Sequence, residues 1–253
     1  KIRKKQKAVP KKVKELAKKS KDFFQDALGE FIYYRTYSRW LPGEKRRETW
    51  IETVDRYIDF MQENLRDKIA KEKYKEIRDY ILNHKAMPSM RLIWAAGKAI
   101  RATNVAAYNC SYIAPNKLKD FAEIMYLLMC GAGVGFSVEN QNVQQLPIIK
   151  HQTREILPVH VIEDSKEGWG NALTLGLKTW YEGKDIQYDY SKIRPYGTRL
   201  KTMGGISSGP EPLKSLLDFT RKKILSNQGK RLSSISVHDI VCKIGQLVEM
   251  GGV

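Results

Sequence analysis

Residues 108–138 read YNCSYIAPNKLKDFAEIMYLLMCGAGVGFSV and carry the clearest structural signal of the chain. Two short runs, 108–114 and 134–138, combine apolar residues with small ones and predict strands. The apolar run 121–129 between them is typical of a helix. The stretch therefore predicts a strand, a helix and a second strand, in that order.

Toward the N-terminus, residues 22–83 have the apolar spacing of helices, with a break at Leu41-Pro42-Gly43. We expect the apolar stripe to pack in a core; its members are Trp50, Val54, Ile58, Met61, Tyr74, Ile77, Tyr80 and Ile81. From Met87 the pattern changes to short apolar runs with small residues and turns, which predicts strands and connecting loops.

Toward the C-terminus, Asp164-Ser165 supplies caps for a helix whose apolar stripe advances by three or four residues. Residues 190–210 are rich in glycine and proline, and predict an irregular loop that carries arginines and a lysine. A further helix is expected around 213–224.

A final helix is predicted from Ser236, with Asp239 as its capping-box partner. The chain then runs into Met250-Gly251-Gly252-Val253, where a glycine pair would turn into a further strand. We therefore expect more polypeptide, covalently joined or not, to complete the fold.

The composition is that of a folded protein. Hydrophobic residues make up 42% of the 253 residues, which suits one large domain or two small ones. The longest apolar runs are too short to cross a bilayer, and no apolar stretch follows the charged N-terminus. These patterns predict a cytoplasmic protein without a membrane partner.

Much of the net charge of +17 is concentrated in residues 1–21, which hold eleven lysines and arginines against the single acid Glu15. Such a block is usually a solvated arm, frayed or helical, that binds polyanions weakly at most. We expect no specific nucleic-acid partner. The alternative is a basic nucleic-acid-binding protein, whose binding to duplex would fall steeply with salt.

The three cysteines, Cys110, Cys130 and Cys242, lack metal-site spacing, and their odd number without a secretion signal argues against a disulfide framework. The four histidines are scattered, so no metal site is expected. Cys130 and Cys242 lie in apolar helical surroundings, which favours core positions. Cys110 lies in an apparently buried strand, but polar Asn109 and Ser111 weaken its interpretation as a core residue.

The glycine cluster Gly131-Ala132-Gly133-Val134-Gly135 is not a dinucleotide fingerprint, because Phe136 stands where the next glycine would be. It is not a phosphate-binding P-loop either, since no Gly-Lys-Ser/Thr follows. It indicates that the backbone approaches something closely, either a ligand or a neighbouring strand.

Taken in order, a set of short motifs resembles the adenosylcobalamin-dependent (class II) ribonucleotide reductases. The motifs are YRTYSR at 34–39, RRETW at 46–50, MPSMR at 87–91, NCS at 109–111, GAGVGFSV at 131–138, EGW at 167–169, SKIRP at 191–195, GGISSGPEP at 204–212, HDI at 238–240 and GGV at 251–253. The resemblance covers roughly residues 30–253 and is greatest to the monomeric triphosphate-reducing branch.

The resemblance implies an α/β fold in three parts. After the basic arm 1–21, a helical region over 22–105 precedes the first half of a ten-stranded α/β barrel over 106–253. This half includes the effector-specificity helix and loop, and it is incomplete without a C-terminal complement.

The resemblance also implies a reaction. In the family, adenosylcobalamin generates a thiyl radical that abstracts hydrogen from the ribose of a ribonucleotide, and two further cysteines supply electrons and become a disulfide. Cys110 matches the first cysteine of that reducing pair. The radical cysteine and the second reducing cysteine are expected on a C-terminal reductase portion, which would also bind most of the cofactor. An external dithiol such as thioredoxin would restore the thiols.

Five residues match the family's substrate pocket. Ser89 and Met90 match a loop that meets the phosphates and sugar, and Asn109 borders the same pocket. Ala132 and Gly133 match backbone positions beside the ribose. The substrate is expected to be a ribonucleoside triphosphate, with a diphosphate as the alternative.

The loop 194–208 matches the segment that links a deoxynucleoside triphosphate (dNTP) effector to the substrate base. The effector-site candidates are Asp164, Lys166, Arg194, Arg199 and Lys201, for which a solvated surface is the alternative interpretation. A non-catalytic, dNTP-binding regulatory module derived from a reductase is the alternative for the whole chain. Cys130 departs from the family pattern, which has a small or polar residue at this position.

Overall fold

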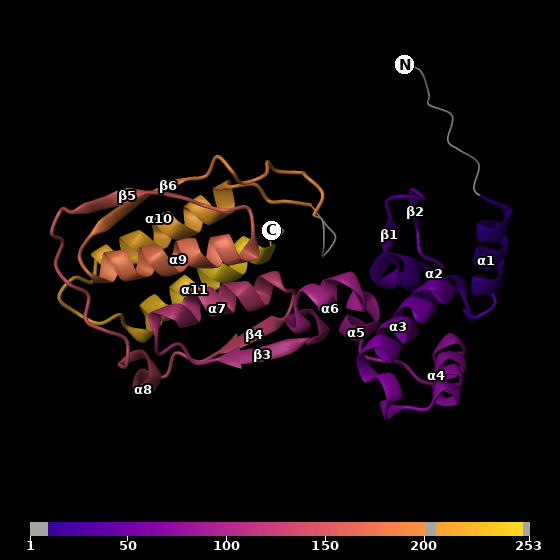
Figure 1. The fold of residues 1–253 in the computed structure, drawn as a ribbon. Coiled ribbons are helices and arrows are strands. Elements are labelled where there is room, and N and C mark those ends of the chain that lie inside the picture. Colours follow the sequence, from indigo (N-terminus) through magenta and orange to yellow (C-terminus); the bar gives the residue numbers. More distant parts are fainter. Residues whose placement is uncertain (1–9, 201–205, 250–253) are drawn as a thin grey trace, which may run out of the picture. The chain divides into compact units, whose positions relative to one another are not determined.

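The computed structural model describes residues 10–200 and 206–249 (Figure 1). The chain divides into two compact units, Lys1–Ala107 and Tyr108–Val253. Within the described ranges, no helix is long and apolar enough to cross a membrane.

The first unit is mainly helical. Its helical elements are α1 (Lys11–Lys21), α2 (Ala27–Ile32), the π-helical turn η1 (Tyr33–Tyr37), α3 (Trp50–Leu65), the 3-10 turn η2 (Arg66–Lys68), α4 (Lys71–Leu82), α5 (Met90–Ala95), α6 (Lys98–Ala102) and the 3-10 turn η3 (Asn104–Ala107). A hairpin of β1 (Trp40–Leu41) and β2 (Arg46–Arg47) lies at the predicted break after Leu41.

Helix α3 is the centre of this unit and contacts α1, α4 and α5. It begins with a capping box, in which Thr49 and Glu52 each accept a hydrogen bond from the other's backbone amide. Trp50 and Val54 are buried, as the periodicity predicts. Tyr80 was expected in the core but is 42% exposed, because it lies on the outer side of α4.

The prediction of strands and loops from Met87 onward is wrong for residues 90–107. These residues form α5, α6 and η3, which are six, five and four residues long. Segments of one or two turns are too short to display a 3.6-residue apolar period, so their small buried side chains resemble a strand pattern.

The second unit contains two parallel strand pairs, each joined through a helix. β3 (Cys110–Ile113), α7 (Leu118–Met129) and β4 (Gly133–Phe136) form the first, and β5 (Ile156–Val161), α9 (Lys166–Tyr181) and β6 (Asp185–Asp189) form the second. The remaining helices are α8 (Asn140–Val143), α10 (Glu211–Leu225) and α11 (Ser234–Glu249). The predicted strand–helix–strand order over 108–138 is confirmed.

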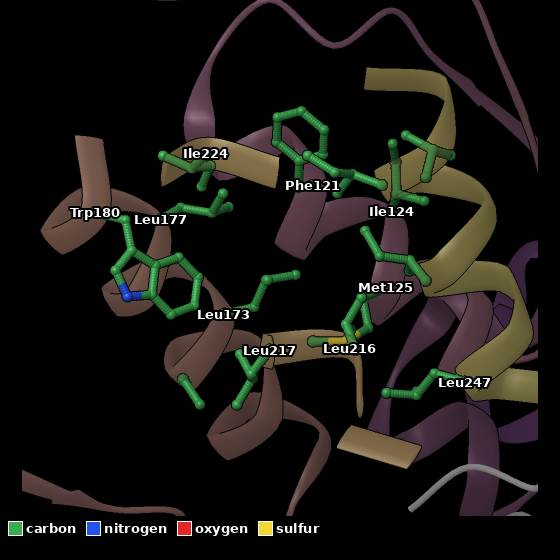
Figure 2. Close-up of a cluster of buried hydrophobic side chains, with 14 of the residues drawn as sticks. Phe121, Ile124, Met125, Leu173, Leu177, Trp180, Leu216, Leu217, Ile224 and Leu247 are labelled. Atoms are coloured by element: carbon green, nitrogen blue, oxygen red, sulfur yellow. The ribbon is translucent and has the colours of Figure 1, made fainter. Parts of the chain in front are cut away.

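The helices of the second unit form a layer between its two strand pairs (Figure 1). Helix α7 contacts β3 and β4, α9 contacts β6, and the two helices pack against each other. The core lies in this layer: Phe121 and Ile124 of α7 meet Leu173 and Leu177 of α9 and side chains of α10 and α11 (Figure 2). Each such fully buried side chain contributes about 1.5–3 kcal/mol.

Two details of the second unit differ from the sequence prediction. Strands β5 and β6 were both missed, and in β5 Pro158 and a register shift between Leu157 and His160 interrupt the alternation. The last helix begins at Ser234 rather than Ser236, and its Asp239 is no capping partner, because its carboxylate accepts a hydrogen bond from Lys223 Nζ at 2.6 Å.

Candidate active site

Cys110 lies on the exposed face of the β3–β4 pair. The parallel register places it opposite Gly133, and places Tyr112 opposite Gly135. Because side chains alternate along a strand, the other face carries Ile113 and its neighbours, which pack against the helical core. The expectation that Cys110 lies in a buried strand is therefore wrong, since the helices cover one face of the pair and Cys110 is on the other.

Gly131 has a structural role at the end of α7. Its φ of +86° lies in the left-handed region, and its amide donates to Leu128 O at 2.8 Å. The amide of Ala132 donates to Leu127 O at 3.1 Å. This pair of bonds is a Schellman motif, which ends a helix with glycine because other residues are strained there.

Gly133 and Gly135 are different, because the described chain leaves space beside both. A Cβ atom added at Gly133 would lie 3.5 Å from Asn109 O, and one at Gly135 would lie 3.7 Å from Ser111 O. Both distances are ordinary van der Waals contacts, so no described neighbouring strand requires glycine there. Within the described residues, the space beside both glycines is therefore open.

The backbone around these glycines is fixed on both sides. The amide of Gly133 donates to Asn109 O at 2.8 Å, and the hydroxyl of Ser111 donates to Gly133 O at 3.1 Å. Asn109 is exposed beside Cys110, whereas Ala132 is 2% exposed and its amide is used in the helix end. The polar side chain of Ser111, unexpected in a core strand, thus holds the Gly133 carbonyl, whereas Asn109 takes part through its backbone oxygen and its side chain is exposed.

Two of the substrate-pocket candidates, Ser89 and Met90, lie in the first unit. Ser89 is the N-cap of α5 and its hydroxyl accepts from Leu92 N at 3.2 Å, while Met90 is 46% exposed. Local capping therefore accounts for a serine at position 89, and the exposure of Met90 leaves its side chain available.

Helix α5 is anchored at its other end by Arg56. This guanidinium donates to Ile93 O at 3.1 Å and to Ala96 O at 2.9 Å. It also forms a two-pronged ion pair with the buried carboxylate of Glu48, with Nε–Oε1 at 2.9 Å and Nη2–Oε2 at 3.0 Å. The loop that carries Ser89 is thus held to α3 through one buried ion pair, which the sequence did not reveal because position 56 lies far from position 93.

The effector-site candidates are brought together only in part. Arg194 Nε lies 2.6 Å from Asp164 Oδ2, so the loop is tied to the residue before the N-cap of α9. Lys166 Nζ lies 3.4 Å from Cys130 Sγ. Arg199 pairs through its backbone with Ile206 in an isolated antiparallel bridge. Lys201, the fifth candidate, lies outside the described residues.

The other two cysteines differ in burial. Cys130 is 1% exposed at the C-cap of α7, which confirms its core position. Cys242 was expected in the core but is exposed, because α11 buries Ile240, Val241 and Ile244 on its opposite side. Its sulfur lies 3.6 Å from His238 Nε2, one helical turn away.

A cleft of about 400 Å³ lies where the loop after β6 meets α10 and α11. It was not predicted, because it depends on how α10 packs against α11. Its lining residues are Tyr196, Ser208, Glu211, Pro212, Ser215, Lys243, Gln246 and Leu247.

Two family models match the chain. The ribonucleotide reductase alpha domain matches residues 9–98, and the insertion domain of B12-dependent ribonucleotide reductase matches residues 137–224. The first match lies within the helical unit, and the second runs from the end of β4 into α10.

Curated relatives match nearly the whole chain. The chain is 32% identical to the adenosylcobalamin-dependent ribonucleoside-triphosphate reductase of Euglena gracilis, over 96% of this chain and 36% of the relative. It is 30% identical to the reductase of the same name from Lactobacillus leichmannii, over 89% of this chain and 40% of the relative. The chain therefore spans well under half the length of these relatives.

A solved structure agrees with these matches. The crystal structure of a B-12 dependent (class II) ribonucleotide reductase superposes with a TM-score of 0.77 at 26% identity, over 95% of this chain and 43% of that one. The ordered motifs, the two family models, the relatives and this fold agree with one another. The chain belongs to the adenosylcobalamin-dependent (class II) ribonucleotide reductases and corresponds to an N-terminal portion of such an enzyme.

Proposed function

We propose that this chain supplies one of the two reducing thiols of a ribonucleotide reductase that converts ribonucleoside triphosphates to deoxyribonucleotides. The observation that carries the proposal is the position of Cys110, on an uncovered strand face opposite Gly133. The triphosphate rather than the diphosphate is favoured by the names of the relatives, which are ribonucleoside-triphosphate reductases.

Cys110 acts as a two-electron donor together with a second cysteine on the C-terminal reductase portion. The two thiols lose two protons and two electrons and close an S–S bond, and the substrate gains the electrons as its hydroxyl leaves as water. An external dithiol such as thioredoxin then reduces the disulfide by thiol–disulfide exchange. The exposure of Cys110 supports this role, because both sulfur partners must reach it.

The substrate sugar lies over the open face beside Cys110. Gly133 leaves room for the ribose, and Asn109 borders the same face. Tyr112, two residues from Cys110 and 66% exposed, is a further wall of this pocket that the sequence comparison did not single out. Tyr112 could have been predicted from the sequence, since residues two positions apart on a strand share a face and Cys110 was already a candidate. Ala132 contributes through its backbone. Ser89 and Met90 are assigned to the substrate phosphates from the family pattern alone.

We place the remaining strands of a ten-stranded barrel on the C-terminal portion, with residues 106–253 as its first half. The two parallel strand–helix–strand units support this, since parallel strands joined by helices are the repeat of such barrels. The family pattern assigns adenosylcobalamin mainly to the C-terminal portion, and no step is routed through it here.

A dNTP effector binds beside the N-terminus of α9 and the loop that follows β6. Asp164, Lys166, Arg194 and Arg199 lie on these two segments, and the Asp164–Arg194 ion pair joins them. Lys201 is assigned to the same site from the family pattern. The cationic groups suit a triphosphate, and the ion pair gives the loop a fixed starting point from which to respond to the bound base.

The test is a turnover assay with CTP or CDP, adenosylcobalamin, dithiothreitol and dATP. The chain is assayed alone and then mixed with a C-terminal reductase fragment that carries the other cysteines. We expect deoxynucleotide only from the mixture, and its loss in Cys110→Ser. No product from the mixture, with dNTP binding intact, would replace this proposal with a regulatory module in which Cys110 is dispensable.

A further inference from the structure

Helix α1 carries a dense row of positive charge. Its eleven residues, 11–21, include six lysines and the single acid Glu15. The lysines Lys11, Lys12, Lys14, Lys18 and Lys19 are exposed, and their side chains form no hydrogen bond or ion pair within the described residues, while Lys21 pairs with Glu30 at 3.5 Å. We call the five unpaired lysines the lysine face.

The lysine face is displayed on a docked helix. Val13, Leu16 and Ala17 are partly buried on the other side of α1, and Ser20 is 1% exposed. The hydroxyl of Ser20 accepts from Ile51 N at 3.3 Å, so α1 is joined to the first turn of α3. The expected solvated arm is therefore, over residues 11–21, a helix held in place by its apolar side.

The lysine face is unfavourably placed at one end of the helix only. Lys11, Lys12 and Lys14 lie in or next to the first turn, which has no acidic residue and where the helix dipole disfavours cations. Lys18 and Lys19 lie in the last turn, where the dipole favours them, and the exposed Glu15 stands three or four residues from Lys11, Lys12, Lys18 and Lys19. A polyanion laid along α1 would offset the unfavourable placement of the first three lysines.

We propose that the lysine face of α1 binds the phosphate backbone of double-stranded DNA without sequence specificity. The helix is about 16 Å long at 1.5 Å per residue, so it can span several phosphates of a duplex. All five groups are lysines, with no arginine, asparagine or glutamine among them to read base edges. The contact therefore positions the protein on the backbone and does not select a sequence.

An anionic membrane is disfavoured as the partner. A helix that lies on a bilayer inserts an apolar face, and the apolar side of α1 is packed toward α3. The next helix, α2, exposes Leu28 and Phe31, but it also carries Glu30 and its cap Asp26, which anionic lipids would repel.

The experiment measures anisotropy of two labelled 20-base-pair duplexes of unrelated sequence with the full chain between 50 and 200 mM NaCl. We expect equal affinity for both duplexes. If about five phosphates are neutralised, affinity should fall on the order of 10²–10³-fold over this range. Two other polyanions are tested in parallel: vesicles that contain phosphatidylserine, and free polyglutamate.

The test variant changes the five lysines of the lysine face to Gln, which has a similar helix propensity. The matched control changes five other exposed lysines to Gln, removing the same charge; they are Lys68, Lys71, Lys75, Lys119 and Lys178. Circular dichroism verifies that both remain helical. A second variant, Lys18→Gln with Lys19→Gln, should lower the salt slope by about 2, or about 1 per phosphate contact.

The expected result is loss of duplex binding in the test variant and its retention in the control. Equal losses in the two five-lysine variants would assign the binding to net charge and overturn the proposal. So would unchanged binding by the test variant, or an α1-dependent affinity for vesicles or polyglutamate that duplex DNA does not share. None of these outcomes depends on reductase activity.

Discussion

Cys110 lies directly opposite Gly133 in the parallel register of β3 and β4. No side chain on the adjacent strand therefore stands beside the thiol at that level. The described chain would accommodate a Cβ at Gly133, so the missing side chain is not explained by the packing of this unit. This relationship separates the glycines of the cluster into one that ends a helix and two that keep a surface open.

Substitution of the two kinds of glycine should affect the free energy of unfolding to different extents. Gly133→Ala is expected to change the free energy of unfolding by less than about 0.5 kcal/mol, because the new methyl group meets only ordinary contacts. Gly131→Ala should destabilise by about 1–3 kcal/mol, because its φ of +86° strains any residue with a Cβ. Urea denaturation of the chain alone compares the two, and turnover in the reconstituted mixture should fall more for Gly133→Val than for Gly133→Ala.

The three thiols should differ in reactivity toward a thiol reagent. Cys110 and Cys242 are exposed, so both should react in the folded chain. Cys130 is 1% exposed and should react only after unfolding. Titration with a chromogenic disulfide is the measurement, with Cys110→Ser and Cys242→Ser identifying each fast-reacting thiol. A fast-reacting Cys130 in the native chain would contradict the burial described for α7.

Removal of Arg56 should destabilise the first unit strongly. Arg56→Met leaves the Glu48 carboxylate, whose side chain is 6% exposed, buried without its partner, at a cost of about 3–5 kcal/mol. Arg78→Met is the matched control: its pair with Asp55 is 38% and 44% exposed, so the loss should be below about 1 kcal/mol. Hydrogen exchange should also show faster exchange in α5 for Arg56→Met alone, because Arg56 holds the carbonyls of Ile93 and Ala96.

Asp185 should make the stability of the second unit depend on acid pH. Hydrogen bonding from Arg221 holds the pKa of its carboxyl below the ordinary value. Its contribution is therefore fully present above the unfolded pKa of about 3.9 and is lost as pH falls through the lower folded pKa. Asp185→Asn should cost about 1–2 kcal/mol at pH 7 and progressively less below pH 4.

Urea denaturation at pH 7, 4 and 3 measures this difference. Asp59→Asn is the control, since the Asp59 side chain is exposed and has no hydrogen bond or ion pair within the described residues. If the difference in unfolding free energy between wild type and Asp185→Asn stays constant down to pH 3, the interaction with Arg221 does not favour the charged form of the Asp185 carboxyl.

The sequence predicted those elements whose apolar pattern runs over several turns of one continuous segment. The run 121–129 and the glycines after it specify α7 and its end, and the stripe after Ser165 specifies α9. The exposure of Cys110 could not be predicted, because a four-residue strand shows its alternation without showing which face the helices will cover. The Arg194–Asp164 pair joins positions 30 apart and becomes visible only when the loop after β6 returns to α9.

The uncovered face of the β3–β4 pair has a practical consequence for handling the chain by itself. The thiol of Cys110 is exposed there, as are Tyr108 and Tyr112 two residues away on either side, so the thiols of two copies can reach each other. In air this arrangement favours covalent dimers linked through Cys110. Storage under reductant would prevent this covalent dimer. Non-reducing electrophoresis would reveal the dimer in the wild-type chain and its absence in Cys110→Ser.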